Sequence, residues 1–198
     1  MDFNAIIKRA IGIITKPNEE WKTIKDESAT ISDLFMKYAI ILAAIPAIAG
    51  FLGWTVFGKS YMGFAIRMPA GRSLMWAILT YAFSIISVYI LALIIDALAP
   101  TFGAQKDMIK SLKIAVYSAT ATWVAGILYI IPALAFLAMI AGFYSLYLLF
   151  TGIKNLKETP KDKEVGYFIA IIVAQIVLGV VIGMIVASIA FGSTRAWM

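Results

Sequence analysis

The chain has 198 residues, of which 62% are hydrophobic and only 14% charged, and it contains neither cysteine nor histidine. A water-soluble domain of this size would still expose roughly 30% of the surface of its unfolded chain, so this much apolar area predicts an integral membrane protein. The missing residue types exclude disulfides, thiolate nucleophiles, imidazole bases and the usual transition-metal ligands, and we expect no catalytic residues, no metal site and no cofactor.

Residues 1–33 form an amphipathic segment that we expect on the cytoplasmic side. Its first helix ends at Pro17 and is suited to lying in the inner headgroup layer, with binding of a partner protein as the alternative. A second short helix, residues 19–27, carries Trp21 and Ile24 on one side, and Thr30 to Asp33 supply N-cap chemistry for the first span. The apolar residues at helical spacing in the first helix are Phe3, Ile6, Ile7, Ala10, Ile11 and Ile14.

Four long stretches of the chain carry no charged residue: 38–58, 73–95, 114–153 and 165–194. A helix crosses the roughly 30 Å hydrocarbon core in about 20 residues, so three of these stretches each predict one span. The stretch 114–153 is about twice too long for one span, and Pro132 lies near its middle. Two spans joined by a tight turn at Pro132 explain this length better than one very long kinked helix.

The predicted spans are therefore residues 34–57, 73–98, 113–131, 133–153 and 165–191. They define the fold class as an all-α membrane protein, a five-helix transmembrane bundle with an N-terminal interfacial amphipathic helix. Residues 34–198 form the transmembrane domain, and residues 1–33 precede it.

Lys and Arg are distributed unequally between the two faces that five spans imply. Thirteen of the 17 lie on the side of the N-terminus and four on the other side. The positive-inside rule then predicts a cytoplasmic N-terminus and an outside C-terminus. The same placement explains the net charge of +6, because these cations fix topology and meet anionic headgroups. We therefore expect the lipid bilayer, and no nucleic acid, as a partner.

Polar side chains within the spans are costly in lipid and tend to mark function. Several lie in the inner half of the bundle, and we hypothesise that they line an inward-facing pocket with Gln175 at its bottom, about 15 Å deep, and Asp96 at its mouth. The alternative is that hydroxyls bond to their own helices and that Asp96 pairs with Lys106, Lys110 or Lys113. The candidates are Asp96, Tyr117, Ser118, Thr120, Thr122, Tyr144, Ser145, Tyr147 and Gln175, and the second span adds a stripe of Thr80, Ser84 and Ser87.

Small residues recur every fourth position in two of the spans. In lipid, such stripes let helix backbones approach closely. They serve packing within the bundle or homo-oligomerisation, and the sequence leaves both open. The stripes are Gly179, Gly183 and Ala187 in the last span and Ala39, Ala43 and Ala47 in the first.

Several segments resemble prokaryotic Yip1-domain proteins. Residues 17–27 match the pattern P-x-x-x-W-x-x-I-x-x-E, and the stretch 142–152 in the fourth span is the most specific part. The resemblance runs from about Ile14 to the fifth span; Ala121 departs from it, because many members carry proline there. It implies five spans, a cytoplasmic N-terminus and location in a prokaryotic plasma (inner) membrane. Its eukaryotic members act in vesicle traffic and bind prenylated Rab GTPases through cytosolic regions.

The sequence favours a non-enzymatic membrane scaffold or adaptor that organises protein partners at the cytoplasmic face, in membrane organisation or protein trafficking. A lipid-binding protein and a small-solute transporter or channel are the alternatives, and both would use the polar pocket. The lack of a charged residue near the membrane midplane weighs against a coupled transporter.

Overall fold

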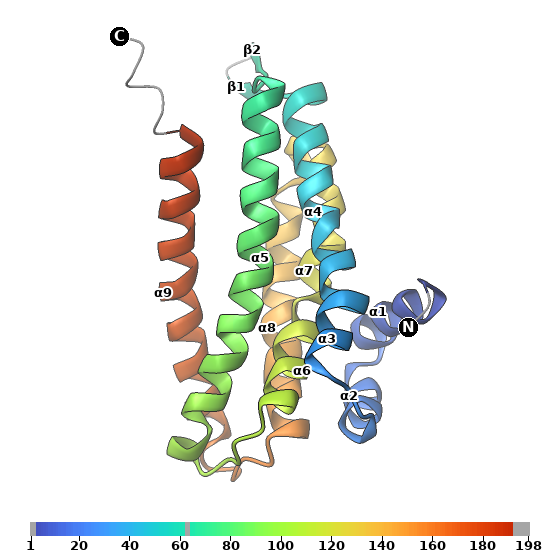
Figure 1. The fold of residues 1–198 in the computed structure, drawn as a ribbon, viewed down its shortest axis with the longest axis vertical. Helices are drawn as coiled ribbons and strands as arrows, with labels where there is room; N and C mark the ends of the chain where they lie inside the picture. The colour runs from blue at the N-terminus through green and yellow to red at the C-terminus, as the bar shows by residue number, and fades with distance from the viewer. Residues whose placement is uncertain (1–2, 62–63, 192–198) are drawn as a thin grey trace.

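The computed structural model describes residues 3–61 and 64–191, and almost all of these residues are helical (Figure 1). Five helical segments in this part of the chain are long and apolar enough to cross a membrane. Each coincides with one predicted span, which confirms the five-helix all-α bundle. The segments are Ile31–Phe57, Ala70–Phe102, Met108–Ile130, Leu137–Leu156 and Glu164–Ile189.

The first span is built from four helical pieces that continue one another. Its start carries the expected cap: the Thr30 hydroxyl accepts from the Asp33 backbone N–H at 3.1 Å, and the Asp33 carboxylate accepts from the Thr30 backbone N–H at 3.3 Å. The pieces are α3 (Ile31–Leu34), a π-helical turn (Phe35–Ala39), α4 (Ile40–Leu52) and a second π-helical turn (Gly53–Phe57).

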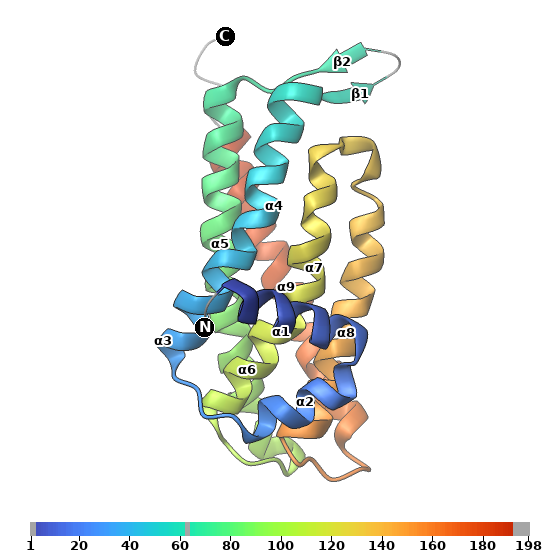
Figure 2. The same ribbon diagram turned by 90° about the vertical axis from the view of Figure 1, so that its right-hand side faces the viewer.

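Two short strands, β1 (Lys59–Tyr61) and β2 (Phe64–Ile66), pair antiparallel at the end of the bundle away from α1 (Figure 2). The chain then returns through a long helix, α5 (Ala70–Leu98), which tightens into a 3₁₀ turn (Ala99–Phe102). Gly103 ends this turn with φ +73°, a left-handed conformation that glycine adopts without a steric penalty.

The third and fourth spans form the predicted hairpin around Pro132. Asp107 caps the third span, because its carboxylate accepts from the Lys110 backbone N–H at 2.9 Å. The turn is wider than the sequence suggested, since α-helix resumes only at Leu137. The elements are α6 (Met108–Ser118), α7 (Thr120–Ala125), two 3₁₀ turns (Gly126–Ile130 and Pro132–Leu134) and α8 (Leu137–Leu156).

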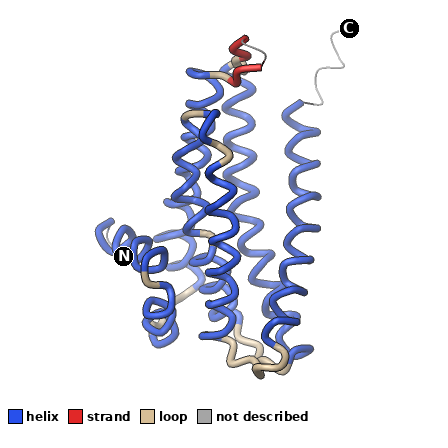
Figure 3. The backbone as a smooth tube through the Cα atoms, turned by 180° about the vertical axis from the view of Figure 1, so that it is seen from behind, coloured by secondary structure: helices blue, strands red, loops and turns tan. Residues whose placement is uncertain are grey.

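The last helix, α9 (Glu164–Phe191), lies at the edge of the bundle. Figures 1 and 3 show α9 close to α5 at the end of the bundle where α5 ends and α9 begins, which we call the loop end. The two helices diverge toward the C-terminus. The first turns of α9 are fixed by Tyr167, which stacks on Phe102 at 5.2 Å and donates a hydrogen bond to the Ile95 carbonyl. Beyond Ile171, no described residue of α9 is buried.

The N-terminal helices pack crosswise on the outside of the spans (Figure 2). Ile6, Ala10 and Ile13 of α1 (Phe3–Thr15) are buried in the same hydrophobic core as the spans. Phe3 and Ile11, by contrast, are 67% and 57% exposed. This helix thus has two apolar faces, one for the bundle and one free to enter the headgroup–acyl boundary, as a membrane-surface helix requires.

Trp21 joins α2 (Pro17–Asp26) to the fourth span. Its ring is fully buried, lies edge-on to Tyr117 at 6.3 Å, and occupies the space where a side chain at Gly152 would clash. Its Nε1–H donates to the Thr151 hydroxyl at 3.1 Å. The expectation that Trp21 and Ile24 share one face of a short helix is confirmed, because both are completely buried.

We expect Trp21→Phe to cost about 1–2 kcal/mol, because it removes the Nε1–H donor and part of the buried ring. In detergent the thermal midpoint should fall by roughly 2–8 °C. Thr151→Val removes the same hydrogen bond from the other side, so the double variant should cost less than the sum of the single variants. Strict additivity in this cycle would show that the hydrogen bond contributes nothing.

Candidate functional site: a polar cavity beside α9

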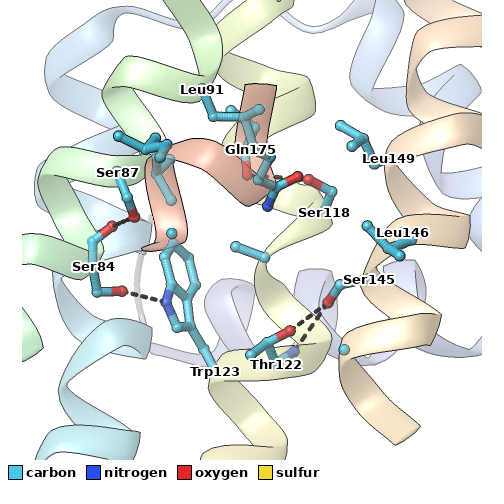
Figure 4. Close-up of a pocket in the computed structure, with 16 residues that line it drawn as sticks. Ser84, Ser87, Leu91, Ser118, Thr122, Trp123, Ser145, Leu146, Leu149 and Gln175 are labelled. Atoms are coloured by element: carbon cyan, nitrogen blue, oxygen red, sulfur yellow. Dashed lines mark hydrogen bonds between the residues drawn. The ribbon is translucent and has the colours of Figure 1, made fainter. Parts of the chain in front are cut away.

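A cavity of about 330 Å³ lies between α5, α6, α7, α8 and α9 (Figure 4). It has a mixed lining, with hydroxyl and amide groups set among small and aliphatic side chains, and none of the described residues that line it is charged. Its polar lining residues are Ser84, Ser87, Ser118, Thr122, Trp123, Ser145 and Gln175.

Two hydrogen-bonded pairs that join different spans shape the cavity wall (Figure 4). The Trp123 Nε1–H donates to the Ser84 hydroxyl at 3.0 Å, which joins the third span to the second. The Thr122 and Ser145 hydroxyls are 2.7 Å apart, and the Thr122 backbone N–H also donates to Ser145 at 3.2 Å. These pairs connect the third span to its neighbours, so the polar wall is held at fixed positions.

Gln175 is the polar group that the cavity leaves unsatisfied. Its Oε1 atom is buried and accepts no hydrogen bond from the described residues. A buried acceptor without a partner costs about 1–3 kcal/mol, so this amide favours an occupant that carries a donor.

The structure brings together four of the nine residues expected to form the pocket: Ser118, Thr122, Ser145 and Gln175. Ser84 and Ser87, expected as a stripe on the second span, join them. Trp123 was not among the candidates, although an indole N–H inside a span needs a hydrogen-bond partner and is a signal for such a site.

Four other candidates lie on the face of the bundle that α1 and α2 cover. The Thr120 hydroxyl is hydrogen-bonded to Tyr38 at 2.9 Å, and Tyr117 packs against the rings of Trp21 and Tyr38. Tyr144 donates to the Ile14 carbonyl of α1 at 2.6 Å. Tyr147, whose ring centroid is 5.6 Å from that of Tyr144, is partly exposed beside them. Tyr117 and Tyr144 thus contact the N-terminal helices, and none of the four residues lines the cavity.

Asp96 lies at the loop end of the bundle, apart from the cavity. Its carboxylate accepts from the Asp107 backbone N–H at 2.8 Å and from the Ser111 hydroxyl and the Lys157 ammonium at 3.2 Å each. The alternative in which Asp96 pairs with Lys106, Lys110 or Lys113 is therefore wrong. The contacts of Asp96 join the connection after α5 to the end of α8.

The side chain of Lys157 is completely buried, and burial lowers its pKa although the hydrogen bond and charge of Asp96 act in the opposite direction. Lys113 is engaged elsewhere: its ammonium donates to the backbone carbonyls of Ile24, at 2.6 Å, and of Glu27. The sequence did not distinguish Lys157 from the neighbouring loop lysines, because only the tertiary fold buries it.

The small residues of the last span line a groove of about 420 Å³ between α5 and α9, opposite Trp76 and Thr80. A side chain at Gly179 or Gly183 would meet no atom within 4 Å, so the backbones of α5 and α9 do not approach closely there. In the first span, by contrast, Ala39, Ala43 and Ala47 are buried. Homo-oligomerisation through Gly179, Gly183 and Ala187 stays a prediction.

The profile of the Yip1 domain matches residues 11–186, which include all or most of every span and the end of α1. The chain belongs to the Yip1 domain family. This Yip1-domain protein is also 26% identical over 160 residues to the inner membrane protein YohC of two Escherichia coli strains. The aligned part covers 79% of this chain and 82% of the relative. No solved structure matches the Yip1-domain protein at a significant level.

These matches confirm the family resemblance drawn from the residues around Trp21 and from the fourth span. Together with the five apolar helices they establish a multi-pass membrane protein of the Yip1 family, related to a protein of the bacterial inner membrane.

Proposed function

We propose that this protein is a non-enzymatic membrane scaffold that holds protein partners at the end of the bundle carrying α2 and the loop between α8 and α9. The observation that supports it is a set of ion pairs that hold the N-terminal helices to each other and to the loop between α8 and α9. The Arg9 guanidinium pairs with Glu20 and Glu27, and Lys25 pairs with Glu158 of the α8–α9 loop at 2.8 Å. A surface that is already ordered loses less conformational entropy when a partner binds.

The chemistry of this end suits a protein or headgroup partner. Lys154, Lys161 and Lys163 are exposed, whereas Lys157 between them is buried. The excess of Lys and Arg on this side supports a cytoplasmic orientation under the positive-inside rule. Exposed cations at the rim of an interface mainly set association rate and specificity.

We expect replacement of Lys154, Lys161 and Lys163 by glutamine to reduce crosslinking to cytoplasmic or membrane partners about five-fold or more. Lys157 is kept, because its buried ammonium holds Asp96. The matched control replaces Lys59, Arg67 and Arg72, which lie before and at the start of α5, near the opposite end of the bundle. The readout is crosslinking in intact cells followed by mass spectrometry.

Equal loss of partners in both triple variants would show that partners do not bind preferentially at the end of the bundle that carries α2 and the α8–α9 loop. Retention of every partner by the Lys154, Lys161 and Lys163 variant, at unchanged expression, would refute the proposed recruiting surface.

A further inference from the structure

The cavity beside α9 lies at the level of α1. Tyr144, the residue before Ser145 of the cavity wall, donates its hydrogen bond to Ile14 in the last turn of α1. The exposed apolar face of α1 is suited to the headgroup–acyl boundary, about 5–10 Å into the leaflet. Figure 1 shows α5 and α9 continuing beyond α1 at their loop ends. The cavity is thus closer to this boundary than the depth of about 15 Å that the residue count along the last span gave for Gln175.

The cavity is closed toward the loops and open toward lipid. Its floor on the loop side is formed by almost fully buried side chains, which are Leu91, Ala115 and Leu149. Each lies one or two turns nearer the loops than the polar cavity residues of its helix. Gly142 and Gln175 belong both to the cavity and to a cleft of about 360 Å³ between α8 and α9.

The rim of this cleft includes Met139, Phe143 and Ile176, which are strongly exposed apolar side chains. Ser84, Ser87 and Gly179 similarly connect the cavity to the groove between α5 and α9. An occupant therefore enters sideways, from the membrane, and its hydrocarbon chain can lie along α9.

The polar groups define what such an occupant carries. The Gln175 Oε1 atom needs a donor. The Gln175 amide N–H groups, and the Ser84 hydroxyl that accepts from Trp123, donate to no acceptor among the described residues, so both can donate to an occupant. A phosphate would be left without a counter-ion in this uncharged lining, and burying an unpaired charge is expensive. The complementary head is small and uncharged, with a hydroxyl donor next to carbonyl acceptors.

We propose that the cavity binds an uncharged lipid of the α1-side leaflet, of the diacylglycerol type, with its hydroxyl on Gln175 and its ester carbonyls facing the Ser84 hydroxyl and the Gln175 amide N–H groups. At least one acyl chain leaves through the clefts beside α9. This site is independent of the scaffold role, since none of the exposed lysines takes part in it.

The test is titration of the full-length protein, in detergent, with dioleoylglycerol and with dioleoylphosphatidylglycerol, read by native mass spectrometry. Wild type should bind one dioleoylglycerol in preference to the anionic lipid. Gln175→Leu, which keeps the side-chain volume, should bind dioleoylglycerol about ten-fold more weakly. Ser188→Ala is the control, because Ser188 is an exposed serine of the same helix that bonds to its own backbone.

A second variant separates binding from folding. A Cβ atom at Gly142 meets no atom within 4 Å, so this position has room for a side chain. We expect Gly142→Leu to fill the mouth of the cavity and to abolish binding at an unchanged thermal midpoint. The proposal is overturned if wild type binds no dioleoylglycerol, if it prefers the anionic lipid, or if Gln175→Leu and Gly142→Leu both bind as wild type does.

Discussion

Arg9→Leu should release α1 from the bundle and lower the thermal midpoint in detergent by roughly 6–12 °C, the equivalent of about 3 kcal/mol. The Arg9 side chain is only 9% exposed, and its two terminal nitrogens pair separately with Glu20 and Glu27. Its guanidinium also lies 5.7 Å from the ring centroid of Tyr117. Removing the Arg9 cation leaves the two partly buried carboxylates of Glu20 and Glu27 near each other without a positive charge to pair with.

The release of α1 can be measured directly, because the sequence contains no cysteine. A single cysteine at Ile13, which is fully buried against the bundle, should react slowly with a maleimide in the otherwise unchanged protein and rapidly in the Arg9→Leu background. Lys8→Leu is the matched control, since Lys8 is the exposed neighbouring cation on the same helix. A protected cysteine and an unshifted midpoint in Arg9→Leu would show that the apolar contacts and the Tyr144 hydrogen bond hold α1 without the Arg9 ion pairs.

Gly53→Ala should destabilise the bundle by about 3 kcal/mol. A Cβ atom at Gly53 would lie 2.0 Å from the carbonyl oxygen of Tyr129, and 3.1 Å from that of Ile130. Both obstacles are backbone atoms, so no side chain can rotate away, and the third span must shift away from the first. Gly126→Ala should act similarly, because its Cβ would lie 2.5 Å from Cβ of Pro46.

Gly183→Ala provides the control for these two substitutions. Nothing lies within 4 Å of its added methyl group, and alanine is favoured over glycine in a helix by up to about 1 kcal/mol. Its thermal midpoint should stay level or rise, whereas those of Gly53→Ala and Gly126→Ala fall. If all three variants melt alike, the close contact between the first and third spans does not contribute to stability.

The spans could be predicted because charged residues, which are costly in hydrocarbon, divide the chain into four long uncharged stretches. The turn at Pro132 followed from length, since no single span needs 40 residues. These arguments depend only on position along the chain. They need no knowledge of which helix packs against which.

The grouping of the polar residues could not be predicted in the same way. Counting residues gives the depth of a side chain in a span but not the side to which it points. Tyr117 and Ser118 are adjacent, yet Tyr117 packs on Trp21 and Ser118 lines the cavity. Tyr144 and Ser145 divide likewise, because successive residues point about 100° apart around a helix.

Ion pairs between residues distant in sequence could not be predicted either. Arg9 interrupts an apolar pattern in the sequence, and nothing local indicates that its partners lie 11 and 18 residues further on. Lys157 is paired with Asp96 across 61 residues. Such pairs become visible only when the helices that carry them are placed in space.

The peripheral position of α9 has a consequence for biosynthesis. The buried core lies almost entirely in the N-terminal helices and the first four spans, and of the α9 side chains that the structure describes, only Tyr167 and Ile171 belong to it. Since chains are synthesised from the N-terminus, this core can assemble in the membrane while the final span is still within the translation machinery. The last span then packs against four spans that are already assembled. Because it is the least buried of the five spans, its position depends more on the surrounding lipid than theirs does.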